Sequence, residues 1–139
     1  MTRRWMQMWL VAGLAGLGGC GGGDDSPQAK CEHIGDTVCD RAVSCVPEFS
    51  GMKQSCLDGF NQGLTCSMAK SVGDSYDACI DQLENADCAA MFPRDSSGAV
   101  ATVVLPNVCR GVVMTGATRA PDLTAVTQSA LGLAPRGTR

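Results

Sequence analysis

The residues with the most distinctive chemistry in this chain are its nine cysteines, eight of which follow the first thirty residues. None of them forms the Cys-x-x-Cys pair of zinc and thioredoxin-like sites, or the Cys-x-x-Cys-His motif that attaches haem. We therefore expect neither a metal nor another cofactor. An even number of cysteines at this density is typical of disulfide bonds in a small exported domain. The predicted disulfide cysteines are Cys31, Cys39, Cys45, Cys56, Cys66, Cys79, Cys88 and Cys109.

The pairing of these eight cysteines is not determined by their order, because about a hundred connectivities are compatible with it. Bonds between different helices are one solution. This hypothesis joins Cys39 to Cys79, Cys45 to Cys56 and Cys88 to Cys109, and leaves Cys31 to Cys66.

The ninth cysteine, Cys20, stands directly after Leu17, Gly18 and Gly19. A leucine, two small residues and a cysteine in this order resemble the lipobox of bacterial lipoproteins. The resemblance implies that the leucine fills an apolar pocket of the lipoprotein signal peptidase, that the glycines admit the backbone to its active site, and that the thiol carries a diacylglyceryl thioether. Gly18 stands where alanine or serine is more usual. We predict that Cys20 is the lipid-modified first residue of the mature protein.

Residues 1–19 have the composition of a signal peptide. Arg3 and Arg4 supply the positive charge, and residues 5–18 form a mostly apolar run. This run is shorter than the ~20 residues of a membrane-spanning helix. An ordinary secretory signal that ends by chance at a cysteine is the alternative, and it would make the protein secreted.

Residues 20–30 are predicted to be the lipidated cysteine and a flexible, polar tether, because glycine and aspartate dominate them. One acyl chain gives only marginal membrane binding, whereas two or three chains, palmitate among them, give a stable anchor. Residue 21 is glycine and not the aspartate that retains lipoproteins in the inner membrane. We therefore expect a location in the cell envelope, at the outer membrane.

Candidate catalytic residues are few. His33 is the only histidine, and a histidine needs a nucleophile beside it for triad chemistry. The spacing of the acidic residues lacks the glycine-containing turn of a calcium loop and indicates a solvated helix face. These acidic residues are Asp74, Asp77, Asp81, Glu84 and Asp87. We predict no catalytic and no metal-binding residues, and a protein that is not an enzyme.

Charge and composition argue against a nucleic-acid partner. The net charge of the full chain is −3, and the loss of Arg3 and Arg4 with the leader would make it more negative. Nucleic-acid binding requires a basic stripe with interleaved aromatic residues, and the sequence contains no such stripe. Both tryptophans, Trp5 and Trp9, lie in the leader, so the core of the remaining domain is poor in large side chains.

Apolar residues at steps of three and four predict an all-α, disulfide-rich bundle of three to four short helices. The expected helices are 31–46, 50–72, 74–92 and a short one at 106–113, with an extended crossing over 99–105. The first helix should end before Pro47, and the second at Gly73. Gly59 and Gly63 within the second helix either allow the close approach of another helix or weaken its middle. Asp74 is the expected N-cap of the third helix.

These elements define one domain, 31–114, after the leader and the tether. Beyond it, residues 115–139 are rich in small residues and are predicted to form a disordered tail, in which 123–131 has only a weak helical pattern.

The cysteine order and its neighbouring residues look like those of small cysteine-rich lipoproteins that are abundant in myxobacteria. The resemblance covers about residues 31–113. It rests on Cys31, Val38-Cys39-Asp40-Arg41, Cys45, Cys56, Tyr76-Asp77-Ala78-Cys79-Ile80, Leu83, Asp87-Cys88 and Leu105-Pro106-Asn107-Val108-Cys109. Those proteins have no assigned activity, so the resemblance implies location and scaffold but transfers no site.

The expected function is that of a lipid-anchored cell-envelope protein whose domain serves as a binding or structural module. The expected partners are the membrane through the lipid anchor, the lipoprotein-processing enzymes during maturation, and an unknown protein or other component of the envelope. A secreted effector or toxin-like disulfide-rich domain is the alternative.

Overall fold

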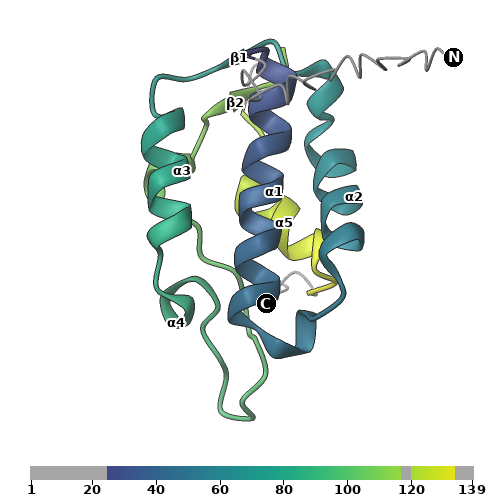
Figure 1. Ribbon diagram of the computed structural model, residues 1–139, viewed down its shortest axis with the longest axis vertical. Helices are drawn as coiled ribbons and strands as arrows, with labels where there is room; N and C mark the ends of the chain where they lie inside the picture. Colours follow the sequence, from purple (N-terminus) through teal and green to yellow (C-terminus); the bar gives the residue numbers. More distant parts are fainter. Residues whose placement is uncertain (1–24, 117–119, 134–139) are drawn as a thin grey trace, which may run out of the picture.

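The computed structural model describes residues 25–116 and 120–133 of the chain, and this part is mostly helical with four disulfide bonds (Figure 1). The prediction of a helical, disulfide-rich domain is therefore confirmed. The α-helices are α1 (Pro27–Cys45), α2 (Lys53–Leu64), α3 (Tyr76–Asn85), α4 (Cys88–Met91) and α5 (Leu123–Ala130). Between them lie the 3-10 turns η1 (Pro47–Phe49), η2 (Cys66–Met68) and η3 (Asn107–Cys109), and the strands β1 (Ser71–Val72) and β2 (Val113–Met114).

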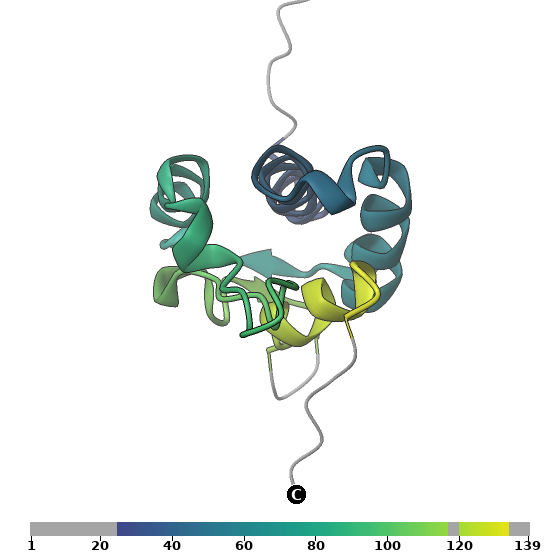
Figure 2. The same ribbon diagram turned by 90° about the horizontal axis from the view of Figure 1, so that it is seen from below.

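The central element is α1, which contacts α2, α3, α4, η1, η2 and β1. Figure 2 shows α3, α1 and α2 in an arc, and α5 with the segment leading to it on the open side of that arc. Apolar residues at steps of three and four form most of the buried stripe of α1. Cys31, Ile34, Val38 and Ala42 are all fully buried. No helix within the described ranges combines the length and the apolar character needed to cross a membrane.

The ends of α1 follow from local sequence. Ser26 is the N-cap, and its Oγ accepts a hydrogen bond from the backbone N–H of Ala29 at 3.1 Å, while Pro27 occupies the first turn. The helix ends at Cys45, and Val46 is extended ahead of Pro47. The predicted end is confirmed. The predicted tether at 20–30 is wrong at its last four residues, because they belong to the helix.

The second helix is shorter than the sequence predicts. It begins at Lys53 and ends at Leu64, because Thr65 adopts a left-handed conformation with φ 52° and ψ 54°. Cys56, Phe60 and Leu64 form its buried face as expected. The helical spacing of the next apolar residues is coincidental, since these residues belong to η2 and to β1.

Helices α1 and α2 approach closely at a glycine. A Cβ atom built on Gly35 would lie 2.5 Å from Cδ1 of Phe60, whose ring is fully buried. Only a residue without a side chain therefore allows the ring to lie against the α1 backbone.

The C-terminal region differs most from the sequence-based prediction. Residues 115–139 are predicted to be a disordered tail, but α5 lies within them and packs against α2. Asp122 caps α5 by accepting a hydrogen bond from the backbone N–H of Thr124 at 3.0 Å. Leu123 and Leu131 are buried in the core. The domain therefore extends beyond the predicted boundary at 114, while residues 117–119 and 134–139 of the predicted tail lie outside the described residues.

The two glycines of α2 allow this contact. A Cβ atom on Gly59 would lie 2.9 Å from Cα of Ala130, and one on Gly63 would lie 2.7 Å from Cγ1 of Val126. Of the two interpretations open from sequence, close approach of a neighbouring helix is confirmed, and that neighbour is α5.

Between α2 and α5 the chain forms α3, α4, an irregular segment and the β1–β2 pair. Helix α3 begins at Tyr76 after Ser75 and not after an Asp74 cap, and Ser75 makes no side-chain capping bond. In the predicted extended crossing at 99–105, Val100 forms an isolated antiparallel bridge with Arg94, and residues 101–105 contain neither helix nor strand. The prediction of a short helix over 106–113 is wrong. A 3-10 turn is followed there by β2, which pairs antiparallel with β1 in the register Ser71 to Met114.

Candidate functional site

The four disulfide bonds are the strongest chemical feature of the described chain. They join Cys31 to Cys66, Cys39 to Cys56, Cys45 to Cys88, and Cys79 to Cys109. Three of them start on α1, so this helix is linked covalently to η2, α2 and α4. The fourth links α3 to η3.

The predicted pairing is correct for Cys31 and Cys66 and wrong for the other three bonds. Cys39 bonds to Cys56 and not to Cys79, Cys45 bonds to Cys88 and not to Cys56, and Cys79 and Cys109 bond to each other. Cys39 and Cys45 are six residues apart, which is about 9 Å of helix rise. Each of the two cysteines therefore meets a different neighbouring element, α2 or α4. Sequence spacing alone does not reveal which element lies beside which turn of α1.

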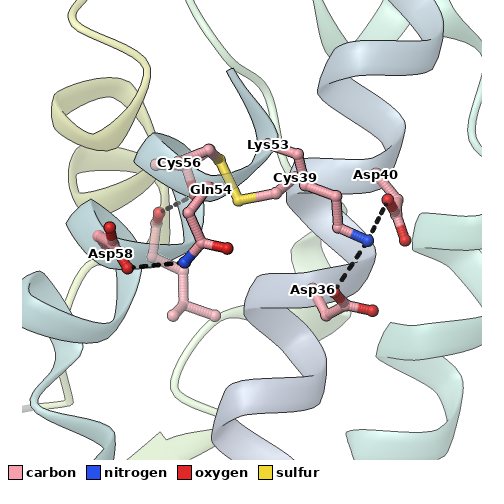
Figure 3. Close-up of a disulfide and its surroundings, with 9 residues drawn as sticks. Asp36, Cys39, Asp40, Lys53, Gln54, Cys56 and Asp58 are labelled. Carbon is pink, nitrogen blue, oxygen red and sulfur yellow. Dashed lines mark hydrogen bonds and ion pairs between the residues drawn. A yellow bond between two sulfur atoms is a disulfide. The ribbon is translucent and has the colours of Figure 1, made fainter. Parts of the chain in front are cut away.

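The bond between Cys39 and Cys56 is bordered by a charged cluster (Figure 3). Lys53 Nζ lies 2.7 Å from Asp40 Oδ1 and 3.2 Å from Asp36 Oδ1, so one cation bridges two carboxylates one helical turn apart. The hydrogen bonds to Asp40 and Asp36 raise the pKa of the Lys53 ammonium. This cluster joins the first turn of α2 to α1 at the surface. Its carboxylates are occupied by the lysine, which indicates a structural role.

His33 contacts a tyrosine across the helix interface. Its Nδ1 lies 2.6 Å from the Tyr76 hydroxyl at the start of α3. Lys30 Nζ is 5.2 Å from the centre of the Tyr76 ring and 3.5 Å from a carboxylate oxygen of Asp25. Burial, followed by the negative charges of Asp77 and Asp25, raises the pKa of Tyr76. A tyrosine hydroxyl is protonated at neutral pH even at its ordinary pKa, and the upward shift favours this form further, so the Tyr76 hydroxyl can donate to His33.

This arrangement links the first two turns of α1 to the start of α3, and no cysteine nucleophile is available to it. Every cysteine in the described ranges is in a disulfide, so none supplies a thiolate to His33.

The acidic series lies on the surface of α3 and its flanks. Its members are the exposed residues Asp74, Asp77, Asp81, Glu84 and Asp87. Asp87 caps α4 by accepting from the backbone N–H of Ala90 at 2.9 Å, and Asp81 accepts from the side chain of Asn85. No set of three or more ligands that could hold a metal ion exists among residues 25–116 and 120–133.

A hollow of about 420 Å³ lies between η3 and the start of α5. Leu105, Pro106 and Pro121 give it apolar walls, and Arg110 and Asp122 place opposite charges at it. Sequence reasoning missed it, because α5 was not expected to dock. The order proline, aspartate, leucine at 121–123 is an N-cap signal that could have indicated this helix start.

The predicted leader and lipidation site lie outside the described residues. This applies to residues 1–24, which include Leu17, Gly18, Gly19 and Cys20. The disulfides nevertheless bear on Cys20, because they consume all eight other cysteines of the chain. No cysteine of the folded domain is left to pair with it.

Comparisons of the chain with protein-family models, with curated proteins and with solved structures gave no match.

Proposed function

We propose that the protein is a lipid-anchored component of a bacterial cell envelope, held through a diacylglyceryl thioether on Cys20. The observation that carries the proposal is the pairing of the eight cysteines from Cys31 to Cys109 among themselves. Cys20 is then the one cysteine with no partner within the chain. Its place after Leu17-Gly18-Gly19 and an apolar leader gives it a chemical use other than a disulfide.

The domain is suited to an oxidising compartment outside the cytoplasm. Disulfides persist in such compartments and are reduced in the cytosol. Each bond contributes typically about 2–4 kcal/mol, which is a large share of the stability of a small domain. We interpret the fold as a bundle built mainly from α1, α2 and α3, with short helices completing it.

The role proposed for this bundle is that of a binding or structural module at the membrane surface. Stable attachment requires two or more acyl chains, and palmitate is the expected chain type. The enzymes that add the lipid and remove residues 1–19 are its expected transient partners. Gly21 in the position after Cys20 favours the outer membrane, and a protein or other envelope component is the expected lasting partner.

The experiment follows the lipid directly. Cells expressing the wild type, Cys20→Ala and the matched control Gly22→Ala are labelled with palmitate, and the N-terminal peptide is analysed by mass spectrometry. We expect the wild type and Gly22→Ala to begin at an acylated Cys20 and to fractionate with membranes. Cys20→Ala should incorporate no label.

Recovery of unlabelled wild-type protein from the medium alone would contradict the proposal. That result would favour the secreted, toxin-like alternative, for which a stable disulfide-rich domain is equally suitable.

A further inference from the structure

The short chain between Cys20 and α1 restricts how an anchored domain can face the membrane. Pro27 follows Cys20 by seven residues, so even a fully extended chain spans at most about 25 Å between them. Helix α1 has 19 residues and is therefore about 28 Å long. An inverted domain with α1 upright and its last turn on the bilayer would place Pro27 farther from the surface than this chain can reach.

The described structure identifies what surrounds the start of α1. The disulfide from Cys31 brings η2 to its first turns, and the contact between His33 and Tyr76 brings the start of α3 there. The β1–β2 pair lies at the same end of the molecule (Figure 1). We call this the anchor end.

The opposite end contains the last turn of α1. Cys45 is bonded there to Cys88 at the start of α4. Cys31 and Cys45 are 14 residues apart along α1, which is about 21 Å of helix. The two ends are therefore far enough apart to differ clearly in their distance from a membrane.

The anchor end exposes side chains that suit a lipid surface. Met68, the last residue of η2, is 56% exposed, one of two large apolar side chains so exposed in the described ranges. Lys70 is also exposed, and its backbone is held by a 2.7 Å hydrogen bond from its N–H to the carbonyl oxygen of Met114. A methionine can insert between headgroups, while a lysine two residues away extends its ammonium to a phosphate.

We infer that the anchor end lies against the phospholipid surface, with Met68 and Lys70 in contact with it, and that α4 is directed away from the membrane. The inference rests on the proposed anchor at Cys20. The exposed carboxylates of Asp74 and Asp77 near the same end offset its lysines. The tether and the apolar contact therefore hold this orientation, and it does not require anionic lipid.

Tryptophan fluorescence can test the orientation, since Trp5 and Trp9 leave with the leader and the mature protein has no other tryptophan. Met68→Trp is compared with Val104→Trp, a matched control because Val104 is the second large exposed apolar residue, at 49%. Val104 lies near the opposite end, where its N–H donates to the carbonyl oxygen of Met91 in α4. Both variants are prepared as the full lipidated protein in phosphatidylcholine vesicles that contain acyl-brominated lipid as quencher.

We expect bromolipid to quench the tryptophan at position 68 at least twofold more than the one at position 104. An insertion of about twenty Gly/Ser residues after Gly23 would remove the constraint that the tether imposes, and should reduce the difference between the two values. Replacing part of the phosphatidylcholine by phosphatidylglycerol should leave the difference in place.

Equal quenching at both positions with the native tether, or stronger quenching at position 104, would overturn the inference while the anchor itself stands. Failure of the wild-type protein to float with the vesicles would instead overturn the proposed function, and the orientation with it.

Discussion

Two regions of this small domain are held together by different means. On α1, cysteines at three levels bond to η2, α2 and α4, so its neighbours are attached covalently. Helix α5 contains no cysteine, and side-chain and backbone packing holds it against α2. Gly59 and Gly63 allow the two backbones to approach, and Thr127 of α5 is fully buried.

The difference shows how a chain with few aromatic residues builds a core. Disulfides stabilise the folded state mainly by reducing the entropy of the unfolded chain, so a domain that has them can be stable with a modest apolar core. Packing at a glycine acts in the folded state and is sensitive to each added methyl group. We therefore expect the α1 contacts to depend on oxidation, and the α5 contact to depend on side-chain volume.

The largest effect should come from removing the central bond of α1. In Cys39→Ala/Cys56→Ala, a bond between two fully buried cysteines is lost. The free energy of unfolding should fall by about 2–5 kcal/mol. Urea denaturation measures the change, and mass spectrometry verifies that the other three bonds are intact.

The matched cysteine control is Cys20→Ala, whose free energy of unfolding should equal that of the wild type because the eight other cysteines pair among themselves. A loss below about 1 kcal/mol in the double variant would show that packing, and not the disulfide, joins α1 to α2.

An intermediate effect is expected where α5 meets α2. Gly59→Ala would place a methyl group 2.9 Å from the backbone of Ala130, which cannot move aside alone, and should destabilise by about 1–3 kcal/mol. The methyl group of Gly63→Ala meets only side-chain atoms, those of Val126, of which Cγ1 would be the nearest at 2.7 Å. A gain in helix propensity of about 1 kcal/mol should offset much of that clash.

Hydrogen exchange distinguishes this local effect from global loss of structure. Gly59→Ala should accelerate exchange of the amides of α5 while those of α1 remain protected. Equal acceleration in both helices would mean that α5 and the disulfide-linked part unfold together. Val126→Ala should remove the remaining penalty of Gly63→Ala if the Cγ1 contact causes it.

The smallest effect is electrostatic and involves η1 and the chain after α4. Arg94 Nη1 lies 2.6 Å from Glu48 Oε1. The hydrogen bond from Arg94 lowers the pKa of Glu48 from 4.5 to about 2. Because the folded pKa is depressed, this stabilisation is present above pH 4.5 and is lost as the pH falls towards 2. Both side chains are exposed, so the effect should be small.

The measurement compares the free energy of unfolding of the wild type and Glu48→Gln between pH 2 and 6. The difference should shrink as the pH falls through this range. Parallel curves would show that the ion pair does not contribute in solution.

Local rules predicted the parts of the fold that depend on local interactions. The helical period identified the buried face of α1, and Pro47 ended that helix where the geometry before proline requires it. The end of α2 was mispredicted, because Thr65 leaves the helix while apolar spacing continues past it. Side-chain contacts between distant residues could not be predicted. The ion pair between Glu48 and Arg94, for example, joins residues 46 positions apart, so no local sequence pattern signals it.

The sequence by itself determined which apolar face of α1 is buried, that eight cysteines suffice for four bonds, and that Cys20 stands apart from them. Those features depend on composition, parity and a repeating step of three to four residues. Only the tertiary structure decided which cysteines meet, and that a segment with weak helical character docks as α5. Both depend on contacts between distant parts of the chain, which form when whole helices pack at a particular level and separation.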